Sequence, residues 1–100
     1  MNEISKVSDI TANDLAEYIR LPEVTADDLN LLNTYLTVSK DFIANYTGVG
    51  SDNLDDYPDF VQVVFVLCQD MYDNRSLYVD KTNLNMMVEA ILGLHRVNFL

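Results

Sequence analysis

The chain has 100 residues, 49% of them hydrophobic and 22% charged, a balance that predicts one globular domain over residues 1–100 rather than a disordered chain. Its formal net charge of −10, from six basic and sixteen acidic residues, argues against a protein that grips nucleic acid by its phosphates. No apolar run reaches the ~18–20 residues of a membrane span, and the first ten residues lack the profile of a secretory signal.

The first predicted helix follows Thr11, which has the residue type of an N-cap. Asp14 stands three residues later, as the carboxylate of a capping box does. Leu21 precedes Pro22, and a residue before proline avoids the helical region of backbone conformation. We therefore expect this helix to end at about Leu21.

The second predicted helix starts at Thr25 in the same way, with Asp28 at the third position, and runs to about Thr47. Gly48 suits the left-handed residue that ends many helices. Apolar side chains fill one half of its circumference, which is wider than the stripe of about 100° needed for one core contact. The surplus favours a second packing partner. These residues are Leu29, Leu31, Leu32, Tyr35, Leu36, Val38, Phe42, Ile43 and Tyr46.

A polar loop is predicted next, over residues 49–57, followed by a helix over residues 58–75. This third helix is apolar around most of its circumference, which is typical of a buried helix. Val66 interrupts its narrow polar strip and is a candidate subunit contact. The strip consists of Asp59, Gln62, Gln69, Asp70 and Asp73.

The fourth predicted helix covers about residues 83–92, after a short loop over residues 76–82. Leu84, Met87, Val88 and Ile91 share its apolar face, Met86 lies off that face, and Gly93 is expected to break the helix. The last residues include Val97, Phe99 and Leu100, which predict a short extended arm. An apolar C-terminal arm is expected to dock on a partner, because chain ends otherwise fray.

The residue types needed for catalysis or metal binding are scarce. Cys68 is expected to be a buried thiol at mid-helix, and His95, the single histidine, has no neighbour at ligand spacing. The acidic cluster Asp52, Asp55, Asp56 and Asp59 does not match a calcium loop. We therefore expect no catalytic residue, no metal site, no cofactor and no enzymatic activity.

Three charged residues of the third helix are candidates for a subunit interface. Asp70 and Asp73, spaced i, i+3, share one face and form either a solvated surface or the acidic half of an intersubunit ion pair. Arg75 falls on the apolar side of the helix. It either reaches past the core to carbonyls or an acid, or forms a bidentate pair with a carboxylate of another segment or subunit.

Two phrases in the sequence resemble those of a known family. The second helix ends in Phe-Ile-Ala-Asn-Tyr-Thr-Gly over residues 42–48, and the third ends in Met-Tyr-Asp-Asn-Arg over residues 71–75. In this order and spacing, over about residues 8–97, the chain resembles the tailed-bacteriophage head–tail connector (adaptor) family, which has phrases like I-x-x-Y-T-G and Y-[ED]-N-R at these places. The matching positions are structural.

The sequence pattern predicts an all-α fold, a small bundle of about four helices with the short extended C-terminal arm, and the resemblance implies a small helical subunit. It implies a virion subunit, made in the host cytoplasm, that forms a homo-oligomeric, dodecameric ring at the head–tail interface. The expected partners are further copies of the chain, the portal protein and a stopper or tail-completion protein. DNA would pass through a central channel without sequence-specific binding, and no membrane is involved. Candidate interface residues are Val66, Asp70, Asp73, Arg75, Met86, Val97, Phe99 and Leu100.

The acidity also allows a function of another class. A DNA mimic or anti-restriction inhibitor would use the charge of −10 to occupy a nucleic-acid-binding enzyme. Such mimics array carboxylates along helix faces. The second predicted helix holds only Asp27, Asp28 and Asp41, so we rank this alternative second.

Overall fold

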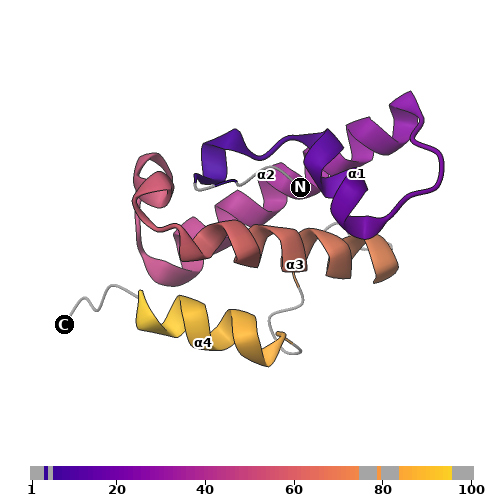
Figure 1. Cartoon of the computed structure of the whole chain (residues 1–100). Coiled ribbons are helices and arrows are strands. Elements are labelled where there is room, and N and C mark those ends of the chain that lie inside the picture. Colours follow the sequence, from indigo (N-terminus) through magenta and orange to yellow (C-terminus); the bar gives the residue numbers. More distant parts are fainter. Residues whose placement is uncertain (1–3, 5, 75–78, 80–83, 96–100) are drawn as a thin grey trace.

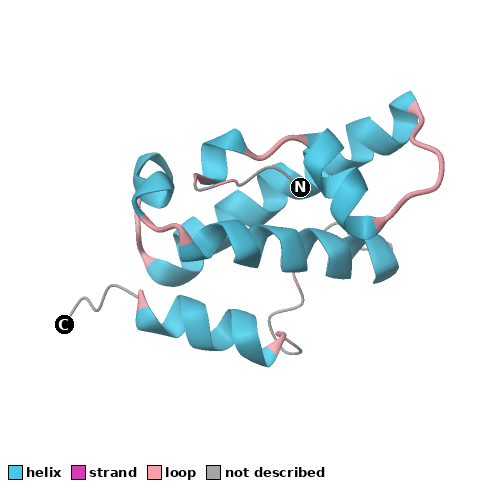
Figure 2. Ribbon diagram, in the orientation of Figure 1, coloured by secondary structure: helices cyan, strands magenta, loops and turns pink. Residues whose placement is uncertain are grey.

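Four α-helices and two short 3₁₀-helices form the described part of the chain. The computed structural model describes residues 4, 6–74, 79 and 84–95, and these include no strand (Figure 2). The predicted all-α bundle is therefore confirmed, whereas the predicted arm over residues 97–100 lies outside the described residues. The elements are η1 (Val7–Asp9), α1 (Ala12–Ile19), α2 (Ala26–Thr47), η2 (Ser51–Asp56), α3 (Asp59–Asn74) and α4 (Met86–Leu94).

Helix α3 lies in the middle of the bundle and contacts each of the other three α-helices. Figure 1 shows α1 and α2 on one side of α3 and α4 along the other side. Helix α4 packs against α3 and α2 and has no described helix beyond it. It is therefore the peripheral helix of the bundle.

Both predicted capping boxes are present. The Thr11 hydroxyl accepts a hydrogen bond from the Asp14 amide at 3.2 Å, and the Asp14 carboxylate accepts one from the Thr11 amide at 2.9 Å. Thr25 and Asp28 repeat the arrangement at the start of α2, with both bonds at 3.1 Å. Each box satisfies amides that the first helical turn leaves without partners.

The ends of α1 and α2 both use a left-handed residue. Gly48 has φ 77°, as predicted for the end of α2. Arg20 has φ 64° and ends α1 one residue before the predicted boundary at Leu21. The Leu21 amide donates to the Ala16 carbonyl at 3.1 Å, which satisfies a carbonyl of the last turn.

The segment predicted to be a polar loop contains η2, and this part of the prediction was incomplete. Leu54 in η2 and Val7 in η1 are both buried. Asp55 joins the two short helices, because its carboxylate accepts hydrogen bonds from the Ser8 amide at 2.8 Å and the Ser8 hydroxyl at 2.7 Å. A polar sequence thus covers one end of the core.

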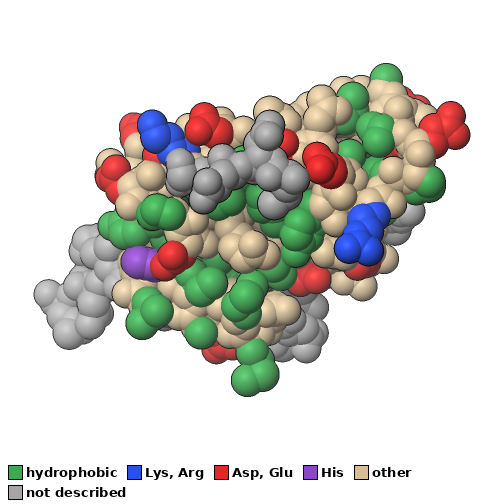
Figure 3. All heavy atoms as spheres, in the orientation of Figure 1, with side chains coloured by type: hydrophobic (Ala, Val, Ile, Leu, Met, Phe, Trp, Pro, Cys, Tyr) green, Lys and Arg blue, Asp and Glu red, His purple; other side chains and the backbone are tan. Residues whose placement is uncertain are grey.

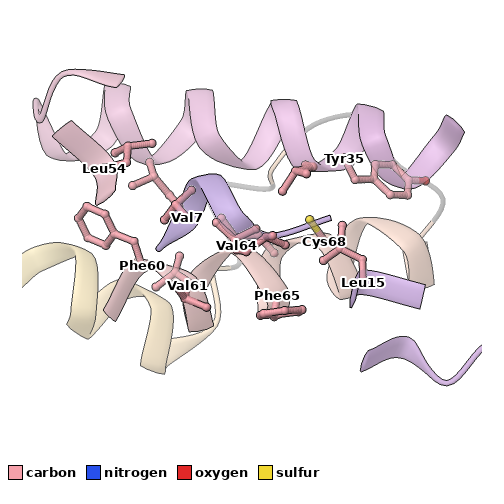
Figure 4. Packing of buried hydrophobic residues seen from close by; sticks show 14 of the residues in the cluster. Val7, Leu15, Tyr35, Leu54, Phe60, Val61, Val64, Phe65 and Cys68 are labelled. Carbon is pink, nitrogen blue, oxygen red and sulfur yellow. The ribbon is translucent and has the colours of Figure 1, made fainter. Parts of the chain in front are cut away.

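The core is centred on α3, as the sequence predicts. Eight of its side chains are buried: Phe60, Val61, Val63, Val64, Phe65, Leu67, Cys68 and Met71. Figure 4 shows several of them in one cluster with Tyr35 of α2 and with Val7 and Leu15 of the N-terminal segment. The Cys68 thiol lies 3.3 Å from the Ser39 hydroxyl of α2, and burial raises its pKa to about 11.

The predicted boundaries and inner face of the fourth helix need correction. Helix α4 begins at Met86, because the Asn85 side chain caps it by accepting from the Met87 amide at 2.8 Å. It continues through Gly93 to Leu94, since a glycine in the last turn does not interrupt it. Val88 and Leu92 form its buried contact, whereas Met87 is 41% exposed.

Candidate functional site

Among the described residues, the cysteine and the histidine have different neighbours. Cys68 is fully buried in α3, beside Ser39. His95, at the end of α4, lies instead beside Asp59. Across the ranges that the structure describes, no three His, Cys, Asp or Glu side chains are grouped so that they could hold a metal ion.

Asp70 and Asp73 are both exposed near the end of α3. Partial burial, and then the like charge of Asp73, raise the pKa of Asp70 above its ordinary value. The Asn74 side chain donates to the Asp70 carbonyl at 2.9 Å, within the last turn of the helix. The two side chains thus form an acidic patch, in which the Asp70 carboxyl group holds its proton more readily than an ordinary aspartate does.

Val66 is half-buried and packs against the core, although it falls on the polar strip of α3. Helix α1 reaches that strip at one point, where the Gln62 amide donates to the Tyr18 hydroxyl at 3.5 Å. Val66 therefore offers less apolar surface than the residues of α4 described next.

Among the residues that the structure describes, the most exposed large hydrophobic side chains lie on α4. Met86 is 86% exposed and Leu94 is 80% exposed. Ala90 and Gly93 are exposed between them along the helix. We call the exposed set Met86, Met87, Ala90, Gly93 and Leu94 the outer face of α4. Figure 3 shows hydrophobic side chains gathered at the lower edge of the molecule, where α4 lies in Figure 1.

Sequence reasoning identified Met86 but missed Leu94 and Met87. The sequence pattern places Leu94 beyond the helix, because Gly93 is expected to end it, and places Met87 on the apolar face with Val88. Glu89 is the one charged residue among the nine positions of α4. A helix with so few charged residues has apolar side chains on both of its faces, and this composition could have identified Leu94 and Met87.

A pocket of about 210 Å³ lies on another part of the surface, lined by Phe42, Asn45, Tyr46 and Val79. The rings of Phe42 and Tyr46 lie one turn apart on α2, with their centroids separated by 5.5 Å. No carboxylate is among the described residues that line this pocket, which we call the Phe42–Tyr46 pocket. Phe42 and Tyr46 belong to the apolar half of α2, which the sequence predicts to be wider than one core contact needs.

Four of the predicted interface residues have no described position. Arg75, Val97, Phe99 and Leu100 lie outside the described residues, so the ion pair and the docking arm predicted for them stay predictions. Of the remaining four, Val66, Asp70 and Asp73 lie on α3 and Met86 on α4.

Comparison with known proteins adds no family. No protein-family model, curated protein or solved structure matches the chain. None of the described helices combines the length and the apolar character needed to cross a membrane.

Proposed function

We propose that this protein is a structural subunit of a phage head–tail connector ring. In this role it docks on the portal after DNA packaging, joins the head to the stopper or tail, and leaves a central channel for DNA. It acts by assembly and has no enzymatic activity. The subunit is made in the host cytoplasm and becomes part of the virion at the head–tail interface.

One observation carries the proposal. The two family-like phrases of the sequence fall at helix ends: residues 42–48 span the end of α2 and its cap Gly48, and residues 71–74 form the last turn of α3. Helix ends determine how the chain turns between packed helices. The phrases therefore sit where a shared arrangement of helices would require similar residues.

The surface of the subunit also supports the proposal. An apolar patch on a small acidic protein is typical of an assembly surface, and the outer face of α4 is such a patch. A net charge of −10 suits a channel through which DNA must pass without adhering. The free chain can be a monomer that assembles on the portal, because the ring needs only a repeated contact between neighbours.

Electron microscopy of the purified chain with the portal ring from the same genome tests this function. We expect an added ring of density on the portal, made of repeated copies of the chain. A portal that stays bare at saturating concentrations of the chain contradicts the proposal. Recovery of a nuclease instead of a capsid protein in a pulldown from infected cells would favour the DNA-mimic alternative.

A further inference from the structure

The outer face of α4 has no packing role within the described chain. The helix is held to the bundle by Val88 and Leu92, both fully buried, on its opposite side. Met86 and Leu94 expose most of their side chains to solvent. Apolar side chains on two sides of one short helix indicate two packing partners, and the bundle supplies one of them.

Gly93 gives a second and independent indication. It is an exposed residue inside α4, and its φ is not in the left-handed region that favours glycine. None of the described residues outside its own turn of helix lies within 4 Å of a Cβ built at this position. Glycine weakens a helix relative to alanine. Its presence here is explained if another backbone approaches closely at this point.

The charge of the protein restricts what that other surface is. Two copies that each carry −10 repel one another, so a contact between copies forms only where carboxylates are few. Few carboxylates lie at either surface: the exposed Glu89 borders the outer face of α4 beside Met86 and Gly93, and no carboxylate is among the described residues that line the Phe42–Tyr46 pocket. The two surfaces can therefore meet across a subunit boundary without placing acid against acid.

The pocket also has a suitable size and lining for a side chain from α4. Its volume is about 210 Å³, and an engineered cavity of about 150 Å³ holds a benzene molecule. Sulfur–aromatic contacts favour methionine beside aromatic rings, and two of the four lining residues are Phe42 and Tyr46. Met86 is the flexible, exposed methionine that can enter such a pocket.

We propose that the outer face of α4 packs against the Phe42–Tyr46 pocket of the next copy of this chain, with Met86 lying against the two rings. This inference rests on the proposed ring, for which it names the contact between neighbours. The donor and receptor surfaces are different parts of each copy, so every copy can bind two others. Such head-to-tail contacts close into a ring when the rotation between neighbours allows it.

Disulfide trapping between two tagged copies tests the contact directly. One copy carries Met86→Cys and the other carries Asn45→Cys, a change at the rim of the pocket. Cys68 stays in place because it is buried, and the parent chain is the control for its reactivity. We expect the mixed pair to form disulfide-linked dimers at least tenfold faster than the pair of Met86→Cys with Asn33→Cys, an exposed site elsewhere on α2.

Two results of the trapping experiment would overturn the proposal. Dimers linked through two copies of Met86→Cys, at a rate above that of the mixed pair, would mean that α4 faces α4 in a two-fold contact. Trapping at the rate of the Asn33→Cys control would mean that the pocket does not receive α4.

The substitution Gly93→Ala distinguishes a contact between copies from a role of Gly93 within the subunit, because only the former affects self-association. The substitution should raise Tm by a few degrees, because alanine favours the helix and meets open space within the subunit. We also expect it to weaken self-association at least fivefold in sedimentation velocity, because the added methyl group separates the two backbones. Asn33→Ala, at the exposed site on α2 outside the pocket, is the control and should leave association unchanged. Unchanged association of Gly93→Ala would overturn the close approach.

The outcomes separate this contact from the ring function on which it rests. If the mixed disulfides form but the portal gains no ring, the connector function fails and the contact stands. If the portal gains a ring that Met86→Asp does not disturb, the contact fails and the function stands. If Met86→Asp abolishes the binding of even single copies to the portal, α4 binds the portal instead and the proposal is overturned.

Discussion

His95 Nε2 lies 3.1 Å from Asp59 Oδ2, which joins the end of α4 to the first turn of α3 across 36 positions of sequence. The His95 ring also packs edge-to-face against two aromatic rings. Its centroid lies 4.9 Å from that of Tyr57 and 5.3 Å from that of Phe60. Together with Val88 and Leu92, this cluster fixes the peripheral helix to the bundle. Histidine therefore has a packing role here, beside its contact with a carboxylate.

Replacing His95 should cost more stability than replacing its acidic partner. Asp59→Asn removes the charge from an exposed pair and should lower the free energy of unfolding by less than about 1 kcal/mol. His95→Ala also removes the ring contacts with Tyr57 and Phe60 and should cost about 1–2 kcal/mol. Urea unfolding followed by circular dichroism measures both. Equal losses for the two variants would contradict the packing role of the ring.

The N-cap of α2 should contribute measurably to stability. Thr25→Ala removes the hydroxyl that accepts from the Asp28 amide, and should cost about 1 kcal/mol. The matched control is Thr34→Ala on the exposed side of the same helix, where the hydroxyl donates back to the Asn30 carbonyl. This control should change the free energy of unfolding by less than about 0.5 kcal/mol. A Thr25→Ala variant as stable as the control would mean that the box is dispensable.

The buried thiol should make the protein less stable in alkali. Burial raises the pKa of Cys68 in the folded state to about 11, from an ordinary value of 9.0. Between these values the unfolded chain loses the thiol proton while the folded chain keeps it, so stability falls as pH rises. The loss attributable to Cys68 should approach about 2–3 kcal/mol by pH 11, and it is absent at pH 8.

Cys68→Ala is the control for that loss, because tyrosines also ionise near pH 10. The difference in unfolding free energy between parent and variant should shrink across this range. A constant difference from pH 8 to pH 11 would argue against a strongly raised thiol pKa.

The contact between η1 and η2 should appear in the titration of Asp55. The Ser8 hydroxyl and the Ser8 amide both donate to its carboxylate, which lowers the pKa below the ordinary 3.8. This contribution to stability is present above the ordinary pKa and is lost as pH falls through the lowered one. In NMR titrations, Ser8→Ala should move the pKa of Asp55 upward. An unchanged value would show that the amide alone holds the carboxylate.

Local chemistry explains which parts of the fold were predictable. The capping boxes at Thr11 and Thr25 and the glycine end of α2 depend on residues three or four positions apart, and all three were predicted correctly. The central position of α3 also followed from its sequence, since a helix apolar on nearly every side must be surrounded.

The features that escaped prediction depend on long-range contacts. The pairs Ser8–Asp55 and His95–Asp59 join residues 47 and 36 positions apart, and nothing in either local sequence identifies the partner. The helical state of η2 rests on burial of Leu54 in a core that only the complete fold creates. The extension of α4 through Gly93 was missed because a glycine signals a helix end only on average.

Because α4 is peripheral, its outer face and helix α3 evolve under different constraints. A substitution in α3 disturbs contacts with three helices at once, so drift there is held back by folding. The outer face of α4 occupies part of a nine-residue helix and can change its side chains without altering the core. A lineage can thus retain one fold while the outer face of α4 diverges, which predicts that variation between relatives will concentrate on this helix.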